Sequence, residues 1–199
     1  MIYPLAFPNK SPASYKLVLK LRQSVAQSPW TYKQTTTGGG SQWMLEWSWP
    51  AMSWNNAEFI DGWLKILNGQ IGSFTFAPRQ PYNFTTTGLT LATIGYNYNG
   101  TISVKGWAAN AGTGLRKGQY FQIGTQLLQV TEAAAFTDAN GAATISFAPE
   151  LRQQYAVGTI VNFVNPVGVF GLTSSEGQSY TLTRDQACEF GPVQAREVV

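Results

Sequence analysis

Hydrophobic and polar residues alternate one by one near the start of the chain. In residues 15–25, YKLVLKLRQSV, leucines occupy one face. Basic side chains occupy the opposite face: Lys16, Lys20 and Arg22. A period of two predicts a β-strand with one face directed inward. The basic face is either a solvated sheet surface or a charged wall directed at a lumen or a partner.

The next segment has the pattern of a long hairpin. A strand predicted from Trp30 to Thr36 is followed by three consecutive glycines, Gly38-Gly39-Gly40, and by QWMLEWSW. We expect the glycines to form the turn, because glycine adopts the backbone angles that tight turns need. Alternation places one set of apolar residues on a common face of the returning strand: Trp43, Leu45, Trp47 and Trp49.

One segment has the signals of a helix. Pro50 ends the preceding strand, and Ser53 is predicted to cap a helix that runs to about Asn68, with Gly69 as its left-handed stop. Apolar residues at helical spacing predict its buried stripe: Phe59, Ile60, Trp63, Leu64 and Leu67. Strand alternation then resumes at Phe74 and Phe76.

From about residue 83 the chain becomes rich in Thr, Gly and Asn, and short strands alternate with turns. Five strands are predicted: Ile102 to Val104, Tyr120 to Ile123, Leu127 to Thr131, Ala143 to Phe147 and Thr159 to Phe163. This rhythm predicts a small five-stranded barrel, with a tight turn at Gly124. Three further strands, at 169–172, 179–182 and 187–190, are expected to complete the first sheet.

Composition favours an assembled protein. Charged residues make up 12% of the 199 residues and aromatic residues 14%. A surface with so few charges is suited to burial against other subunits, so we expect an oligomer. The start of the chain, MIYPLAFPNK, has two prolines and no long apolar run, so we expect neither a signal peptide nor membrane insertion, and synthesis in a cytoplasm.

Several kinds of chemistry are excluded by residue type. The chain has no histidine and one cysteine, so His-based triads, His-metal sites and cysteine zinc sites cannot form. It has no basic run typical of sequence-specific nucleic-acid binding. We therefore expect no catalytic residue, cofactor or metal. Two alternatives stay open: a carbohydrate-binding module that stacks sugars on aromatic rings, and a glycan-cleaving enzyme that uses Glu46.

The order of these elements resembles a known family. The helix segment AEFIDGWLKIL precedes GQIGSFTFAPRQP, and GLRKGQYFQIGTQLLQVTEAA and GAATISFAPELR follow. Together these segments resemble the distal tail proteins of long-tailed, non-contractile bacteriophages, in the form with an inserted barrel of the oligonucleotide/oligosaccharide-binding (OB) type. The resemblance covers nearly the whole chain.

The resemblance implies a mainly β fold in two domains. A tail-tube-like β-sandwich with one flanking α-helix would comprise residues 1–82 and 164–199, and the OB-like barrel residues 83–163. The hairpin from Trp30 to Trp49 would reach a neighbouring subunit. Its predicted interface residues are Trp30, Tyr32, Gly38, Gly39, Gly40, Trp43 and Trp47. Lys16, Lys20 and Arg22 would face the lumen or a partner ring.

The resemblance also implies a place in a virus particle. Such proteins form a ring, usually a hexamer, at the distal end of the tail tube. The expected partners are copies of the same chain, the tail tube protein and the tail tip or hub proteins. DNA would only pass through the channel, and no activity would be catalytic.

Overall fold

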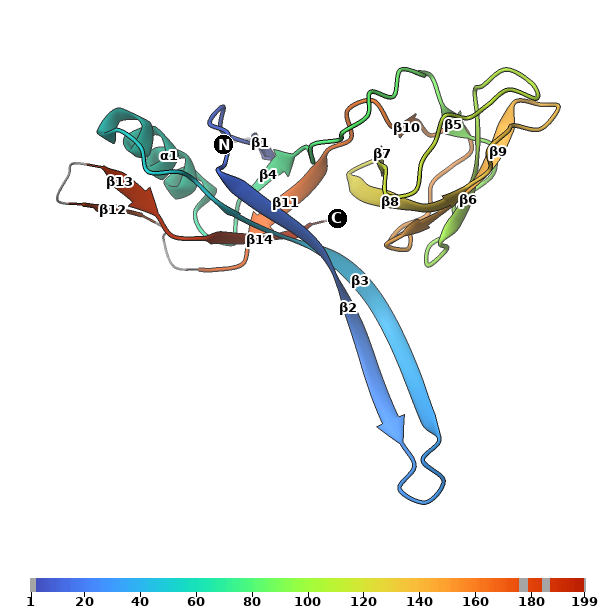
Figure 1. The fold of residues 1–199 in the computed structure, drawn as a ribbon, viewed down its shortest axis with the longest axis horizontal. Helices are drawn as coiled ribbons and strands as arrows, with labels where there is room; N and C mark the ends of the chain where they lie inside the picture. Colours follow the sequence, from blue (N-terminus) through green and yellow to red (C-terminus); the bar gives the residue numbers. More distant parts are fainter. Residues whose placement is uncertain (1–2, 176–178, 184–186, 199) are drawn as a thin grey trace.

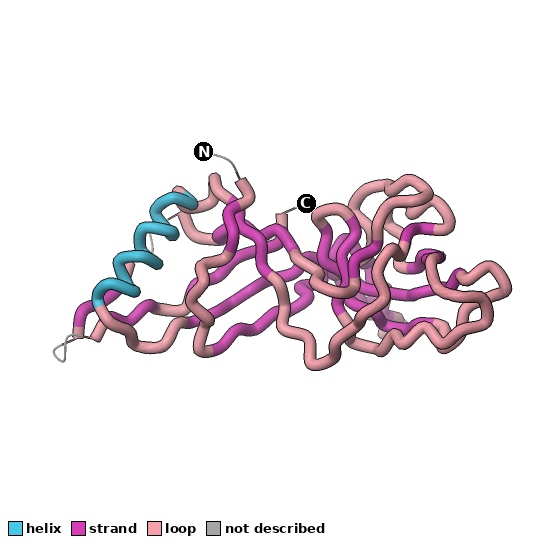
Figure 2. Tube along the Cα trace, turned by 90° about the horizontal axis from the view of Figure 1, so that it is seen from above, coloured by secondary structure: helices cyan, strands magenta, loops and turns pink. Residues whose placement is uncertain are grey.

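The protein consists of a sheet, a barrel and a projecting two-stranded arm (Figure 1). A computed structural model of the chain describes residues 3–175, 179–183 and 187–198. Strands dominate the described residues, which contain one helix, so the predicted mainly β fold is confirmed. The helix lies at one end of the body and the barrel at the other, as the view from above also shows (Figure 2).

The first sheet has six strands contributed by distant parts of the chain. In spatial order they are β1 (Leu5–Ala6), β4 (Ser73–Phe76), β11 (Gly168–Leu172), β14 (Val193–Glu197), β3 (Gln34–Ser48) and β2 (Ser14–Gln27). Neighbours are antiparallel except β1 and β4. The strand β2 lies at the edge, so one side of it has no strand partner among the described residues.

One face of this sheet is covered by the helix and by a two-stranded ribbon. The helix α1 (Trp54–Leu67) buries its predicted stripe except Phe59, which is exposed. The ribbon pairs β12 (Tyr180–Leu182) with β13 (Cys188–Phe190). These two strands were expected to complete the first sheet, but they form a separate sheet, and of the three strands predicted there only β11 joins the first sheet. Aromatic rings fill the space between these layers, with Phe74 in edge contact with both Trp47 and Trp63. This second layer takes the place of the second sheet of a sandwich.

The ends of α1 differ in detail from the prediction. Ser53 precedes the helix with an extended backbone, but its side chain makes no capping hydrogen bond. Its carbonyl instead accepts hydrogen bonds from the backbone N–H groups of Asn56 and Ala57. At the other end Asn68 is the first left-handed residue, with φ of 50°, and Gly69 follows with φ of 62°. Asparagine tolerates this conformation better than most residues, so the helix stops one residue early.

The second sheet curls into a nearly closed barrel. Its order is β10 (Val161–Asn162), β7 (Tyr120–Ile123), β8 (Gln126–Ala133), β9 (Ala142–Ala148), β6 (Thr101–Lys105) and β5 (Thr90–Leu91). Backbone bonds between the two end segments, Leu91 N–H to the Thr159 carbonyl and Val161 N–H to the Leu89 carbonyl, nearly close it. The five predicted strands are present, and the two-residue β5 is a sixth that is too short for its alternation to be recognised.

The turn at Gly124 joins β7 to β8 as predicted. Gly124 has φ of 58°, and a Cβ atom there would lie 2.9 Å from the Tyr155 ring. Both the backbone angle and the close ring therefore require glycine at this position.

The chain enters and leaves the barrel at neighbouring points of the first sheet. The strand β4 ends at Phe76, and β11 begins at Gly168, which is the register partner of Phe76. All strands of the barrel lie between these residues in sequence. The last strand of the first sheet, β14, was not among the strands predicted from the sequence.

Candidate interaction site: the arm and the groove at its base

The arm is the part of the β2–β3 hairpin that extends beyond the sheet (Figure 1). The two strands pair from Ser14 with Ser48 to Gln27 with Gln34. Only the base of this ladder has a further neighbour, because β14 pairs with β3 over Met44 to Trp47. The rest of the hairpin is a two-stranded ribbon.

The tip of the arm lies at residues 28–33, so the predicted turn at Gly38-Gly39-Gly40 is wrong. Ser28 and Lys33 are joined by a backbone hydrogen bond of 3.0 Å, and Tyr32 donates its N–H to the Ser28 carbonyl at 2.9 Å. Pro29 explains the turn, since proline has no N–H to donate to a ladder. The predicted strand from Trp30 to Thr36 is therefore divided between the turn and β3.

The three glycines lie within β3 and form an irregularity of the ladder. Leu21 pairs with Ser41 and Gln23 pairs with Gly38, so two steps along β2 match three steps along β3. Gly40 has φ of 65°, which suits the extra residue of a β-bulge. Glycine supports a bulge and a turn equally well, and this explains the wrong prediction.

The arm has almost no core of its own. Leu21 and Val25 are each 55% exposed, and β3 contributes Thr35, Thr36 and Thr37 on the way back. At the tip Trp30 is 90% exposed, and Tyr32 is exposed too. A single hairpin is marginally stable in water, and large exposed aromatic side chains are typical anchors of protein interfaces. This geometry fits an arm that packs on another surface.

Trp43 and Trp47, expected at a subunit interface, are buried in the chain's own core. Both lie on the face of β3 that packs under α1 and against the barrel. Trp43 donates its indole N–H to the Leu127 carbonyl of the barrel at 2.8 Å. The prediction that Trp43 and Trp47 share one face of the strand is therefore confirmed. The prediction that they lie at a subunit interface is wrong, because this face is buried inside the chain.

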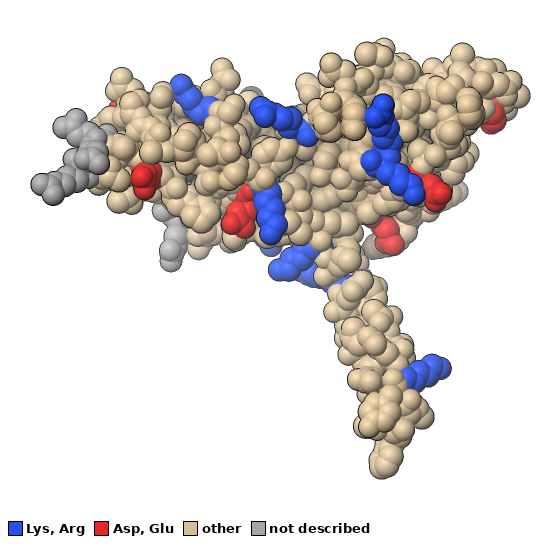
Figure 3. All heavy atoms as spheres, in the orientation of Figure 1, with Lys and Arg blue, Asp and Glu red and all other residues tan. Residues whose placement is uncertain are grey.

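The basic side chains lie on the opposite, exposed face of the sheet. Lys20 and Arg22 line a hollow of about 620 Å³ where the arm leaves the body, together with Arg196 of β14 and Arg152 of the barrel. Basic side chains gather at this position in the space-filling view (Figure 3). Lys16 lies further along β2, in register with Glu46 of β3. Whether these residues face a lumen or a partner stays a prediction.

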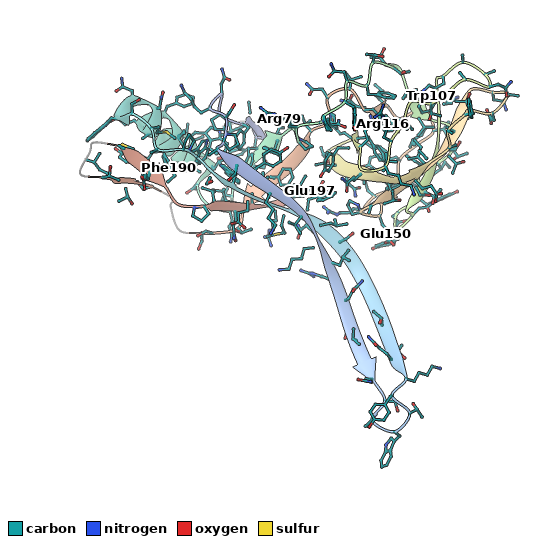
Figure 4. The ribbon with its side chains drawn as sticks, in the orientation of Figure 1. Arg79, Trp107, Arg116, Glu150, Phe190 and Glu197 are labelled. Carbon is teal, nitrogen blue, oxygen red and sulfur yellow. The ribbon has the colours of Figure 1, made fainter. Side chains whose placement is uncertain are left out.

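A buried carboxylate closes the inner wall of this hollow. Glu197 is 1% exposed and lies between the sheet and the barrel (Figure 4). Its two oxygens accept hydrogen bonds from the Leu127 N–H at 2.8 Å and from Arg152 Nη2 at 2.7 Å. Burial raises the pKa of Glu197, and Arg152 opposes this effect. Since the same Arg152 Nη2 also donates to the Ser41 carbonyl at 3.0 Å, the pair joins barrel, β14 and β3.

Sequence reasoning missed this junction, although a signal was present. In VQARE, Val193 and Ala195 share a face with Glu197, so alternation places an acid on an apolar face. A carboxylate at such a position requires a buried partner. Nothing in the sequence names the partner, because Arg152 lies on a loop that follows β9.

Glu46 is the candidate acid of the glycan-cleaving alternative. Glu46 is exposed, on the opposite face from the tryptophans as predicted. Its carboxylate accepts a long hydrogen bond of 3.4 Å from the side-chain amide of Gln194. The described ranges contain no cluster of three or more acidic or cysteine side chains that could hold a metal ion. No helix among the residues described is long and apolar enough to cross a membrane.

A scan of the chain against protein-family models found no match, and a search of curated proteins found no significant relative.

Proposed function

We propose that the protein is a structural virion component that forms a ring, most simply a hexamer, at the distal end of a phage tail tube. The ring would connect the tube to the tail tip proteins and leave a channel for DNA. The residues 1–82 and 164–199 would form the ring and residues 83–163 an outer barrel. The family resemblance of the sequence suggests this role, and the arm supports it.

The observation that carries the proposal is an arm without a core that ends in exposed aromatic residues. Trp30 and Tyr32 are exposed in the turn at the far end of the two-stranded arm (Figure 1). Among the described residues, the edge strand β2 also has backbone groups without a strand partner. In a closed ring each subunit presents one such surface and receives another, so no surface is left free.

The test is the mass of the particle in solution. Light scattering should give a multiple of the 21.8 kDa chain mass, with six as the expected number, and negative-stain images should show annular particles. The double substitution Trp30→Ala/Tyr32→Ala should release monomers, because truncation of an interface anchor costs about 2 kcal/mol or more. Phe136→Ala removes an exposed ring from the barrel and serves as the control.

A monomer at all concentrations would contradict the ring, and an arm variant with the mass of the wild-type particle would show that Trp30 and Tyr32 do not hold the ring together.

A second candidate function is carbohydrate binding by the barrel. Tyr96 and Tyr98 are exposed in the loop between β5 and β6, and exposed aromatic rings can stack on sugar faces. Tyr98 has φ of 61°, which places a bulky residue in a region that L-residues rarely adopt. Glycan binding by a monomer, lost on Tyr98→Ala, would favour this function over the ring.

A further inference from the structure

The hollow at the base of the arm continues along the exposed sheet face as one groove. Lys20 and Met44 line the basic hollow and also a second hollow of about 390 Å³. The second hollow is mainly apolar, with Val18 and Leu45 in its lining, and the register partners Lys16 and Glu46 lie together at its far end. We call these two hollows together the base groove. It presents positive charge at one end and an apolar floor next to it.

The basic end of the base groove carries more positive charge than the chain itself neutralises. Four cationic side chains line it against one carboxylate, Glu197, which is already bound by Arg152. In the described part of the chain, no carboxylate lies within 4.0 Å of the charged groups of Lys20, Arg22 or Arg196. All three side chains are exposed. Three cations that converge on one hollow without a counter-charge favour an anionic occupant.

We propose that the base groove binds an extended acidic segment of a different protein, with a carboxylate-rich part on Lys20, Arg22 and Arg196 and an apolar side chain on the floor around Met44. The three cations would attract the carboxylates of the segment. The adjoining apolar hollow would hold an apolar side chain, which a protein has and a bare phosphate chain lacks.

The occupant is a different protein because this chain has no suitable segment. Its ten acidic residues are dispersed, and no two lie closer than Glu58 and Asp61, three positions apart. An extended segment displays every second residue on one face, so carboxylates two positions apart are needed to reach neighbouring cations. A second copy of the chain cannot supply them. If the segment belongs to a tube or tip protein, the inference rests on the proposed function.

The test uses a short fluorescein-labelled peptide with aspartate at alternate positions around a central leucine. Fluorescence anisotropy should show binding to the full-length protein that weakens as salt is raised, since exposed charge pairs are screened. The double substitution Lys20→Gln/Arg196→Gln should weaken binding about tenfold. A control variant, Lys105→Gln/Lys117→Gln, removes the same charge from exposed positions on the barrel and should bind unchanged. The matched peptide with asparagine in place of aspartate should not bind.

Three results would overturn the inference: no binding of the acidic peptide at low salt, equal weakening by the barrel control, or tighter binding of a single-stranded oligonucleotide of the same charge. The last result would identify the groove as a nucleic-acid surface. Peptide binding and particle mass are measured separately. A monomer that binds the peptide would therefore contradict the ring but support the inference about the base groove.

Discussion

The barrel and the arm use the same antiparallel strands in opposite ways. The barrel bends its sheet until the end strands nearly meet and fills its interior with buried residues such as Phe121, Ile145 and Phe163. The arm keeps both edges open and exposes Leu21, Val25 and Trp30. Apolar side chains stabilise a chain only where water is removed from them. The barrel therefore contributes to the stability of the single chain, whereas the arm contributes only when another surface covers it.

The largest expected difference between the two regions is in the cost of removing one apolar side chain from each. Phe121→Ala should lower the free energy of unfolding by about 3–5 kcal/mol, because the ring is fully buried and stacks on Phe163. Leu21→Ala in the arm should change it by less than about 0.5 kcal/mol in dilute, unassembled protein. Urea denaturation measures both values. Similar losses for the two variants would show that the arm is folded into the body.

The junction between barrel and sheet gives the next largest expected effect. Arg152→Ala leaves the Glu197 carboxylate buried without its charged partner, and breaking a buried pair in this way costs about 3 kcal/mol. Lys117→Ala, at an exposed barrel position, is the matched control and should be nearly neutral. If thermal unfolding of the Arg152 variant matched the control, the pair would not hold the two parts together.

A smaller effect is expected from pH. Because burial raises the pKa of Glu197, the folded chain takes up a proton on this group at a higher pH than the unfolded chain does. This group therefore stabilises the fold as pH falls from 7 toward 4.5, and that contribution is lost as pH rises through the raised pKa. Glu197→Gln removes the titration.

The stability of the wild type relative to Glu197→Gln should consequently increase between pH 7 and pH 5, measured by urea denaturation. A constant difference would mean that Arg152 fully compensates for burial.

The sequence predicted the regions with regular periods well. Alternation identified β2 and the buried face of β3, and the rhythm of short segments and turns identified the five predicted barrel strands to within a few residues. The helix was found by its stripe, although the Ser53 side chain makes no capping hydrogen bond. These successes have one physical basis, the need of apolar side chains for a common buried face.

The failures concern features that periodicity does not encode. The glycines of β3 permit a turn and a bulge equally, and only pairing with β2 decides between them. The Glu197–Arg152 contact joins residues 45 positions apart. Of the base groove, the sequence predicted Lys20 and Arg22 but not Arg196 or Arg152, which reach it from other elements.

The register pairing of Phe76 with Gly168 has an architectural consequence. The polypeptide crosses into the barrel and back at two points separated by about one interstrand spacing, roughly 4.8 Å. A module whose own ends lie that close together could be inserted at this point without a change in the pairing of β4 with β11, provided that it also supplied partners for Trp43 and Glu197.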